Sequence, residues 1–335
     1  MTKILITGAS GFIGSFIVEE ALSQGYKTYA GVRRSSSRRY LQDERINFLE
    51  IDFSSKQSIV EALSNFKRDN GSFDYIIHCA GVTKCINKEE FIEVNYLQTK
   101  NFVDSLSELE MVPKQFIYIS TLSVFGPIYE QTYQPIAESD QRQPNTAYGL
   151  SKLKSEQYLE QMPDFPYVIF RPTGVYGPRE GDYFLMIKSI KGHVDFSVGY
   201  KRQDITFVYV KDLVQAIFLA IDKKVNRRAY FVSDGQVYSS RSFSDLIQHE
   251  LGDPFVIHIK SPLFVLKVIS LCAEFLSGLM KKTSTLNSDK YKIMKQRNWQ
   301  CDISPTVEEL GYVPKYKLDR GVKEAVSWYK DEKWI

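Results

Sequence analysis

The chain has 335 residues, enough for one large or two modest domains with a substantial core. Its 43 basic and 40 acidic residues leave a net charge of +3, so no strong field indicates a nucleic-acid partner. The four cysteines have neither metal-ligand spacing nor the density of a secreted scaffold. We therefore expect reduced core thiols and no metal site. With no charged-then-apolar leader at the N-terminus, we expect a cytoplasmic protein.

Strand-like and helix-like segments alternate through the first half of the chain. This alternation is typical of βαβ units. It predicts an α/β fold of Rossmann type, a doubly wound parallel sheet with helices on both faces and ligands at the carboxyl ends of the strands. The strand-like runs are KILIT (3–7), KTYAGV (27–32), INFLEID (46–52), YIIHCAG (75–81), QFIYIST (115–121) and YVIFRP (167–172).

A glycine-rich turn, ITGASGFIG, follows the first of these runs at residues 6–14. Gly8, Gly11 and Gly14 stand where a chain leaving a buried strand enters a helix. Glycine allows a tight curl there and a close approach to a ligand, and the bare helix N-terminus suits a pyrophosphate. The turn therefore predicts a dinucleotide, although a tight turn in any strand-to-helix unit has the same composition.

After Arg171 the strand-like and helix-like segments no longer alternate regularly. We therefore predict a dinucleotide-binding Rossmann domain and a smaller C-terminal substrate lobe. The first comprises residues 1–172, with 206–232 returning to it, and the second comprises residues 173–205 and 233–335.

Tyr148 and Lys152 are four residues apart in the helix-forming stretch AYGLSKLKSEQYLE, so both side chains emerge on one face. A phenol with a pKa of about 10 is a poor catalyst at neutral pH, and a nearby ammonium favours its ionised form. The spacing thus fits a proton-transfer pair. An ordinary surface helix would also carry these two residues.

Hydroxyl side chains follow the strand at 115–121. Ser120, Thr121 and Ser123 lie where the active sites of open sheets collect, and each could donate to a substrate oxygen. The alternative is that they are turn and cap residues.

The chain carries, in this order, the glycine turn, HCAG (78–81), VNYLQT (94–99), ISTLSVFG (119–126), the pair Tyr148 and Lys152, RPTGVYGPRE (171–180) and FVYVKDL (207–213). It also carries the tail LGYVPKYKLDRGVKEAVSWY (310–329). Together, these motifs and their order resemble extended short-chain dehydrogenases/reductases, the NAD(P)-dependent epimerase/dehydratase group, and the tail resembles the C-terminal end of that group.

The resemblance implies an NAD(P)-dependent oxidoreductase with five catalytic-site residues. Tyr148 exchanges a proton with the substrate's alcohol or carbonyl oxygen, while Lys152 holds the nicotinamide ribose and lowers the tyrosine's pKa. Thr121 matches the family's hydroxyl position, with Ser123 as the reserve choice. Asn95 helps to order the site.

The resemblance also implies the residues that bind the cofactor. Among them, Asp52 would meet the adenine, and Ala80 and Gly81 would line the cofactor path. The full predicted set is Gly8, Gly11, Phe12, Ile13, Gly14, Arg33, Arg34, Asp52, Phe53, Ala80, Gly81, Tyr148, Lys152, Pro172 and Val175.

The loop after the second strand favours NADP over NAD. NAD-preferring relatives place an acidic residue there for the ribose hydroxyls, whereas this chain has Val32 followed by Arg33 and Arg34. An arginine fork suits a 2′-phosphate. The alternatives are a solvated basic loop, NAD bound without the acid, and a nuclear-localisation or nucleic-acid patch, which the near-neutral net charge disfavours.

Two departures from the family pattern bear on the small-molecule substrate. Leu122 and Ser123 replace the Asp-Glu pair of the sugar dehydratases. Ile205 stands where many nucleotide-sugar enzymes have an arginine, for which Arg202 is the nearest substitute. Both favour the branch resembling dihydroflavonol reductases and 3β-hydroxysteroid dehydrogenases, which interconvert a ketone and a secondary alcohol on an apolar substrate. The alternatives are a nucleotide-sugar epimerase or reductase, and a regulatory protein, for which the Tyr148–Lys152 pair would be superfluous.

Residues 263–281 form an apolar stretch with a narrow polar stripe at positions 267, 270, 274, 277 and 281. This spacing predicts a helix. It is either buried, in the second lobe or at a homodimer contact, or it lies at a membrane surface near an apolar substrate. Lys267 and Glu274 make a membrane span costly.

Overall fold

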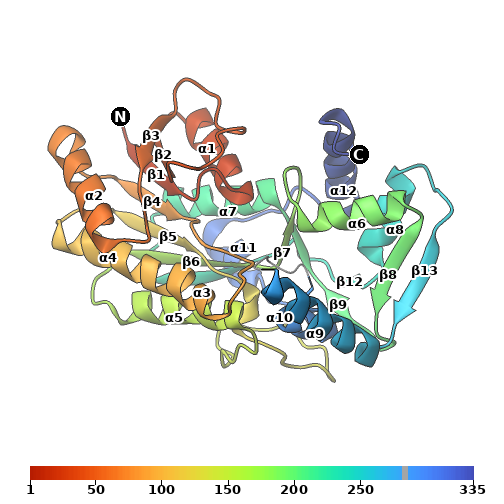
Figure 1. Ribbon diagram of the computed structural model, residues 1–335. Coiled ribbons are helices and arrows are strands. Elements are labelled where there is room, and N and C mark those ends of the chain that lie inside the picture. Colours follow the sequence, from red (N-terminus) through yellow and green to blue (C-terminus); the bar gives the residue numbers. More distant parts are fainter. Residues whose placement is uncertain (281–285) are drawn as a thin grey trace. The chain divides into compact units, whose positions relative to one another are not determined.

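The computed structural model of the protein describes residues 1–280 and 286–335 (Figure 1). The chain divides into two compact units. Unit 1 contains Met1–Val124, Ala147–Arg171 and Val214–Tyr230, and unit 2 contains Phe125–Thr146, Pro172–Leu213 and Phe231–Ile335. The predicted domain division stays a prediction, but residues 125–146 and 206–213, expected in the dinucleotide-binding domain, group with unit 2.

The central sheet has seven strands in the order β11-β6-β5-β4-β1-β2-β3. All pairings from β3 across to β6 are parallel, so the predicted α/β fold is confirmed. Six strands coincide with the predicted runs, and the seventh, β11, was not predicted. The strands are β1 (Lys3–Thr7), β2 (Lys27–Val32), β3 (Asn47–Glu50), β4 (Tyr75–His78), β5 (Gln115–Ile119), β6 (Tyr167–Pro172) and β11 (Arg228–Val232).

Helices cover both faces of this sheet (Figure 1). On one face α2, α4 and α5 lie side by side. On the other face lie α1 and α7, where Phe218 of α7 contacts Tyr26. The elements are α1 (Phe12–Ser23), α2 (Lys56–Asn70), α3 (Glu89–Phe91), the π-helix η1 (Ile92–Leu97), α4 (Gln98–Glu108), the 3₁₀-helix η2 (Leu122–Val124), α5 (Ala147–Gln161) and α7 (Val210–Asp222).

Helix α2 shows how local sequence makes these elements. The Ser55 side chain caps its first turn by accepting from the Ser58 N–H. Ile59, Leu63 and Phe66, at helical spacing, are its buried residues and join the core of unit 1. The helix then ends at a glycine with φ +73°.

The order of the strands predicts a ligand crevice beside β1. From β1 the chain builds β2 and β3 on one side and then crosses to β4 on the other. The loops that leave β1 and β4 therefore diverge, and ligands of open α/β sheets bind in the crevice between such loops at the carboxyl ends of the strands.

Among its described residues, unit 2 has three strand pairs, six helices and an aromatic core that includes Tyr176, Phe207, Phe243 and Tyr329. The pairs are β7 (Gly174–Tyr176) with β10 (Phe207–Tyr209), β9 (Asp204–Ile205) with β12 (Tyr238–Ser239), and β8 (Val194–Val198) with β13 (Ile257–Ser261). The helices are α6 (Asp182–Lys191), α8 (Ser242–Glu250), α9 (Leu263–Leu279), α10 (Ser288–Lys295), α11 (Ser304–Leu310) and α12 (Leu318–Asp331).

Helix α9 occupies most of the apolar stretch for which a helix was predicted, and Lys281 lies outside the described residues. All four cysteines are free, but only Cys85 is buried, and Cys272 of α9 is exposed. The expectation of four core thiols is wrong for Cys272 because α9 turns much of its apolar surface outward.

His78 ends β4 as a neutral, buried side chain. Its Nδ1 atom lies 2.8 Å from the Thr7 hydroxyl and its Nε2 atom 3.0 Å from the Thr99 hydroxyl. Burial, together with the charge of Lys152, lowers the pKa of His78 to about 3. The imidazole therefore ties β4 to β1 and η1–α4 without carrying a charge.

This pKa predicts an acid-sensitive fold. Below about pH 6.5 the unfolded chain protonates His78 while the folded chain does not, so lowering the pH favours unfolding. Between pH 6.5 and pH 5 this group alone removes about 2 kcal/mol of unfolding free energy. Urea titrations at both pH values should show that loss in the wild type but not in His78→Gln. Equal losses in the two proteins would contradict the assignment.

Candidate functional site

The turn after β1 has no room for a side chain at two of its glycines. Gly8 has φ +66°, and a Cβ atom there would lie 2.8 Å from the backbone of Cys79 and Ala80, just after β4. A Cβ atom at Gly14 would overlap the carbonyl group of Gly8. The turn therefore lies against the end of β4, at the crevice that the strand order predicts.

The first turn of α1 presents unused backbone N–H groups at this place. Gly11 is the N-cap, no side chain caps the helix and no acidic residue stands in its first turn. The N–H groups of Phe12, Ile13 and Gly14 come before the first hydrogen bond within the helix. Such N–H groups and the helix dipole suit a pyrophosphate, so these residues fit a dinucleotide and would hold it through the main chain.

The loop after β4 brings the glycine turn close to the predicted catalytic residues. A Cβ atom at Gly81 would lie 2.8 Å from Asn95 Oδ1 and 3.5 Å from Lys152 Nζ. Glycine therefore lets the main chain at Gly81 pass directly beside both side chains.

Asn95 is fully buried in η1, and its side chain uses both ends of its amide. Its Oδ1 atom accepts from the Val82 N–H at 2.8 Å, and its Nδ2 atom donates to the Val82 carbonyl and to the Ser151 hydroxyl at 3.0 Å. Its main-chain carbonyl accepts from the hydroxyl groups of Thr99 and Ser155. Asn95 thus joins the β4 loop to α5, and π-helical turns such as η1 are frequent at functional sites.

Lys152 is a buried cation on α5. Its Nζ atom donates to the Ile119 carbonyl at 2.8 Å and lies over the ring of Tyr118 at 4.7 Å from the centroid. Burial lowers the pKa of Lys152 to about 8, against the opposing effects of Cys79 and Glu156. The ammonium is therefore held at the carboxyl end of β5.

Tyr148, one turn before Lys152, is half-buried and packs edge-on against Phe91. Burial raises the pKa of Tyr148 to about 12, and a hydrogen bond with Thr121 opposes that rise. We expected Lys152 to lower this pKa, but in the structure desolvation of the phenol dominates. The Thr121 hydroxyl donates its one proton to Ser123, at 3.2 Å. Thr121, the first choice for the catalytic hydroxyl, therefore lies close enough to the phenol to affect its pKa.

The other predicted cofactor residues of unit 1 follow β2 and β3. Arg33 and Arg34 are exposed directly after the buried Val32. Asp52 is exposed and accepts from Ser54, and this hydrogen bond, with a smaller effect of Arg33, lowers the pKa of Asp52.

The remaining predicted cofactor residues take different positions. The Phe53 side chain is in the core, 5.2 Å from Phe102 between ring centroids, which leaves its main chain for the predicted contact. Pro172 ends β6 and Val175 lies in β7, both in unit 2. Their roles stay predictions.

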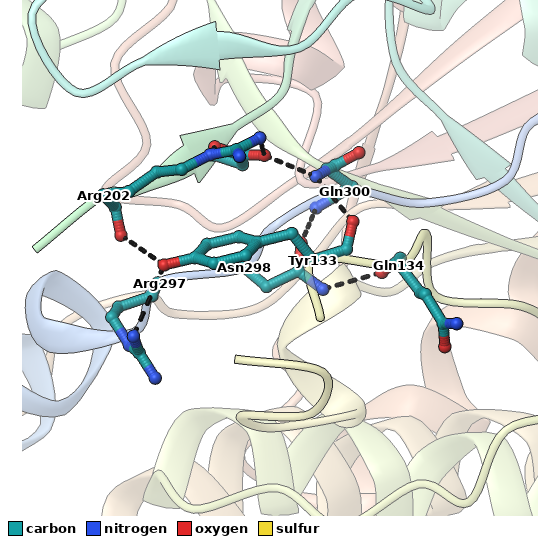
Figure 2. Close-up of polar contacts among 7 residues, drawn as sticks. Tyr133, Gln134, Arg202, Arg297, Asn298 and Gln300 are labelled. Atoms are coloured by element: carbon teal, nitrogen blue, oxygen red, sulfur yellow. Dashed lines mark hydrogen bonds and ion pairs between the residues drawn. The ribbon is translucent and has the colours of Figure 1, made fainter. Parts of the chain in front are cut away.

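Arg202, considered as a substitute for the missing arginine at Ile205, belongs to a polar cluster of unit 2 (Figure 2). Its guanidinium group makes two hydrogen bonds of 2.6 Å with Asp204 and stacks on Tyr133. Gln300 donates to Asp204 at 2.7 Å and to the Tyr133 carbonyl at 3.0 Å. The charge of Arg202 is therefore already paired.

Sequence reasoning missed a buried ion pair next to Lys152. Glu156, one turn further along α5, binds the Arg171 guanidinium through both carboxylate oxygens, at 2.9 to 3.2 Å. Ser120 donates to the same carboxylate. The four-residue spacing from Tyr148 to Lys152 extends to Glu156, and this was the signal that could have revealed it.

Comparisons with known proteins identify the family of the chain. The sequence model of the "NAD dependent epimerase/dehydratase family" matches residues 4–233. The UDP-glucose 4-epimerase of Vibrio cholerae is 26% identical, over 97% of this chain and 94% of its own length. The sterol-4-alpha-carboxylate 3-dehydrogenase, decarboxylating, of Dictyostelium discoideum is 23% identical, over 97% of this chain and 100% of its own.

Solved structures share the fold along almost the whole chain. The UDP-glucose 4-epimerase of Thermotoga maritima, solved with UDP-glucose, matches with a TM-score of 0.79 at 21% identity, over 99% of this chain and 100% of its own. The UDP-glucose 4-epimerase of Thermus thermophilus, solved as a complex with NAD, matches with a TM-score of 0.77 at 19% identity, over 98% and 99% of the two chains.

The contact of Gly81 with Asn95 and Lys152 predicts that a single methyl group disrupts the site. Gly81→Ala must displace the Asn95 side chain, because the added Cβ atom would lie 2.8 Å from its Oδ1 atom, and a misplacement of about 1 Å in an active site costs up to ~100-fold in rate. Because Gly81 also lies on the predicted cofactor path, fluorescence titration with NADPH should show a loss of affinity of roughly tenfold. Gly181→Ala is the matched control, because nothing lies within 4 Å of its added Cβ. Equal affinities for the two variants would contradict this geometry.

Proposed function

Because the chain belongs to the NAD-dependent epimerase/dehydratase family, we propose that it is an epimerase or reductase that oxidises and reduces a secondary alcohol of a nucleotide sugar. The observation that carries the proposal is the Tyr148 phenol, near the Thr121 hydroxyl and one helical turn before the buried ammonium group of Lys152. The similarity to UDP-glucose 4-epimerases along nearly the whole chain supports the substrate class.

The protein's own residues would move a proton at the substrate oxygen. With a pKa near 12, Tyr148 is protonated at neutral pH and suited to donate to a carbonyl oxygen. Thr121 would hold the same oxygen by a second hydrogen bond. In the reverse direction, the positive charge of Lys152 would stabilise the phenolate that accepts the proton. The dinucleotide, when bound, supplies the hydride acceptor and donor.

Dehydration of a sugar by the family's acid–base pair is not supported. Leu122 is buried and has no ionisable group. The Ser123 hydroxyl accepts a hydrogen bond from Thr121 and is not a carboxyl group. Neither can protonate a leaving hydroxyl group or remove a carbon-bound proton. We therefore assign the oxidation and reduction steps to this chain without the elimination.

A second candidate function is the interconversion of a ketone and a secondary alcohol on an apolar substrate. Two observations favour it: Ile205 replaces an arginine common in nucleotide-sugar enzymes, and Arg202 is bound to Asp204. An uncompensated diphosphate would be costly to bury. The similarity to a sterol dehydrogenase also supports this candidate.

Product analysis and cofactor absorbance, recorded in the same assay, distinguish the two candidate functions. The protein is incubated with UDP-hexoses, sterols or aromatic ketones, and both the products and the absorbance of the reduced cofactor are recorded. An epimerase converts the UDP-hexose without net absorbance change, and a reductase consumes reduced cofactor. Turnover of sterols or ketones alone would overturn the nucleotide-sugar proposal.

Removal of the phenol hydroxyl should abolish turnover. Tyr148→Phe keeps the ring and its contact with Phe91 but cannot transfer a proton, and general acid–base catalysis contributes about 10²- to 10⁴-fold. We expect a loss in that range with cofactor affinity nearly unchanged. A loss of less than about tenfold, or ~1.4 kcal/mol in barrier, would mean that the proton has another source. Thr121→Ala should lose more activity than Ser123→Ala.

We further propose that the dinucleotide is NADP rather than NAD. The guanidinium groups of Arg33 and Arg34 have no hydrogen-bond or ion-pair partner among the described residues, and no carboxylate stands at position 32 to bind ribose hydroxyls. Two exposed cations at this position suit a 2′-phosphate. The matched structures include a complex with NAD, so binding of both dinucleotides has to be measured.

The arginine pair predicts a selective loss of affinity. Charge-assisted hydrogen bonds are worth about 1.5–3 kcal/mol, so Arg33→Ala/Arg34→Ala should bind NADPH roughly 10- to 100-fold more weakly and NADH about as before. Arg45→Ala/Arg68→Ala removes the same charge from exposed pairs with Asp43 and Asp69 and serves as the control. Equal titration curves of the unmodified protein with NADH and NADPH would contradict the proposal.

A further inference from the structure

Lys152 has few hydrogen-bond partners for a buried charge. An ammonium group has three N–H donors, and among the described residues only the Ile119 carbonyl accepts from this one, at 2.8 Å. The Lys152 side chain lies in a residue that is 5% exposed, so little solvent reaches it. The remaining donors are available to the predicted dinucleotide, but before it binds the charge needs another source of stabilisation.

The titratable groups around Lys152 in the described part of the chain supply no unbalanced negative charge. Burial raises the pKa of the Cys79 thiol to about 12 and lowers that of His78 to about 3, so both are neutral. Tyr148, with a pKa of about 12, is also neutral. Glu156 is negative, but Arg171 donates to both of its carboxylate oxygens and balances that charge.

The ring of Tyr118 does face the ammonium group. Lys152 Nζ lies over this ring, 4.7 Å from its centroid, which is within the range of a cation–π contact. Burial raises the pKa of the Tyr118 phenol, so the ring is neutral and attracts the cation through its π face. Such a contact is strongest when the cation is removed from water, as it is here.

The fold fixes the plane of the Tyr118 ring. Tyr118 is fully buried on β5, where it pairs in register with His78 of β4. The two rings stack with 6.0 Å between their centroids and 19° between their planes. His78 is itself held between the hydroxyl groups of Thr7 and Thr99. A ring that is fixed by its neighbours in this way can hold a cation of α5 in one place.

We propose that Tyr118 is a positioning residue of the site, and that its ring face holds the Lys152 ammonium group beside the Ile119 carbonyl and keeps it charged. The consequence for the reaction rests on the proposed function, in which the charge of Lys152 stabilises the phenolate of Tyr148. A neutral Lys152 cannot do so. Tyr118 would therefore help to set the pH range in which the protein is active.

Removing the electron density of the ring while keeping its shape tests the proposal. In Tyr118→pentafluorophenylalanine the fluorine atoms withdraw the electron density that faces the cation. With full-length protein labelled with ¹³C at the lysine ε-carbons, we expect the NMR titration midpoint of Lys152 to fall by about one pH unit, because a desolvated cation–π contact changes the protonation equilibrium about tenfold or more. Tyr118→Phe keeps the π face and should titrate like the wild type.

Phe116→pentafluorophenylalanine is the matched control. Phe116 is also fully buried on β5 and also stacks with His78, but Lys152 lies over the ring of Tyr118. The control should leave the midpoint of Lys152 unchanged, and all three variants should keep the melting temperature of the wild type. An unchanged midpoint in Tyr118→pentafluorophenylalanine, a rise towards the ordinary lysine value, or an equal fall in Tyr118→Phe or in the control would overturn the proposal.

The titration requires neither substrate nor turnover, so its failure is distinct from a failure of the proposed function. In a turnover assay, the loss of rate at high pH should begin about one pH unit lower in Tyr118→pentafluorophenylalanine than in Tyr118→Phe. A lower rate with an unchanged pH profile would be a purely structural effect and would overturn the role of Tyr118 in the reaction.

Discussion

The burial of the Lys152 ammonium group is the constraint on which the rest of the site depends. A cation removed from water is costly unless polar groups surround it, and this one is bound by the Ile119 carbonyl. For Lys152 to reach that atom, α5 must lie close to the carboxyl end of β5. Gly81 lacks a side chain, because a Cβ atom there would lie 2.8 Å from Oδ1 of Asn95, which binds Ser151 of α5. One buried charge thus links β4, β5, η1 and α5.

A buried ion pair, Glu156 with Arg171, also holds α5 in this position. Glu156 follows Lys152 by one helical turn. Both of its carboxylate oxygens accept hydrogen bonds from the guanidinium group of Arg171, near the end of β6. Removing one partner of such a pair leaves an unpaired buried charge, a loss of about 3–5 kcal/mol. The pair fixes α5 against β6 and keeps the Tyr148 end of the helix beside Thr121. The chemistry of the site is therefore a consequence of how α5 is anchored.

The features predicted from sequence were those that short-range patterns encode. Six parallel strands, the glycine turn and the spacing of Tyr148 and Lys152 depend on neighbours within about ten residues. Strand β11 was missed because its apolar run is short, with only its last three residues buried. The Glu156–Arg171 pair was missed because its partners lie on different elements, 15 residues apart, although the four-residue spacing marks Glu156. In α9 the polar spacing was visible, but which side faces the protein depends on α10, and only the fold brings the two together.

The pKa of Lys152 tests this account most directly. It can be followed by NMR in protein labelled with ¹³C at the lysine ε-carbons, with Lys152→Met to assign the signal. The account predicts a midpoint near pH 8, because burial of the ammonium lowers the pKa to about 8. A midpoint at the ordinary lysine value, about 10.4, would mean that the ammonium is in water and would contradict the buried charge from which the site is built.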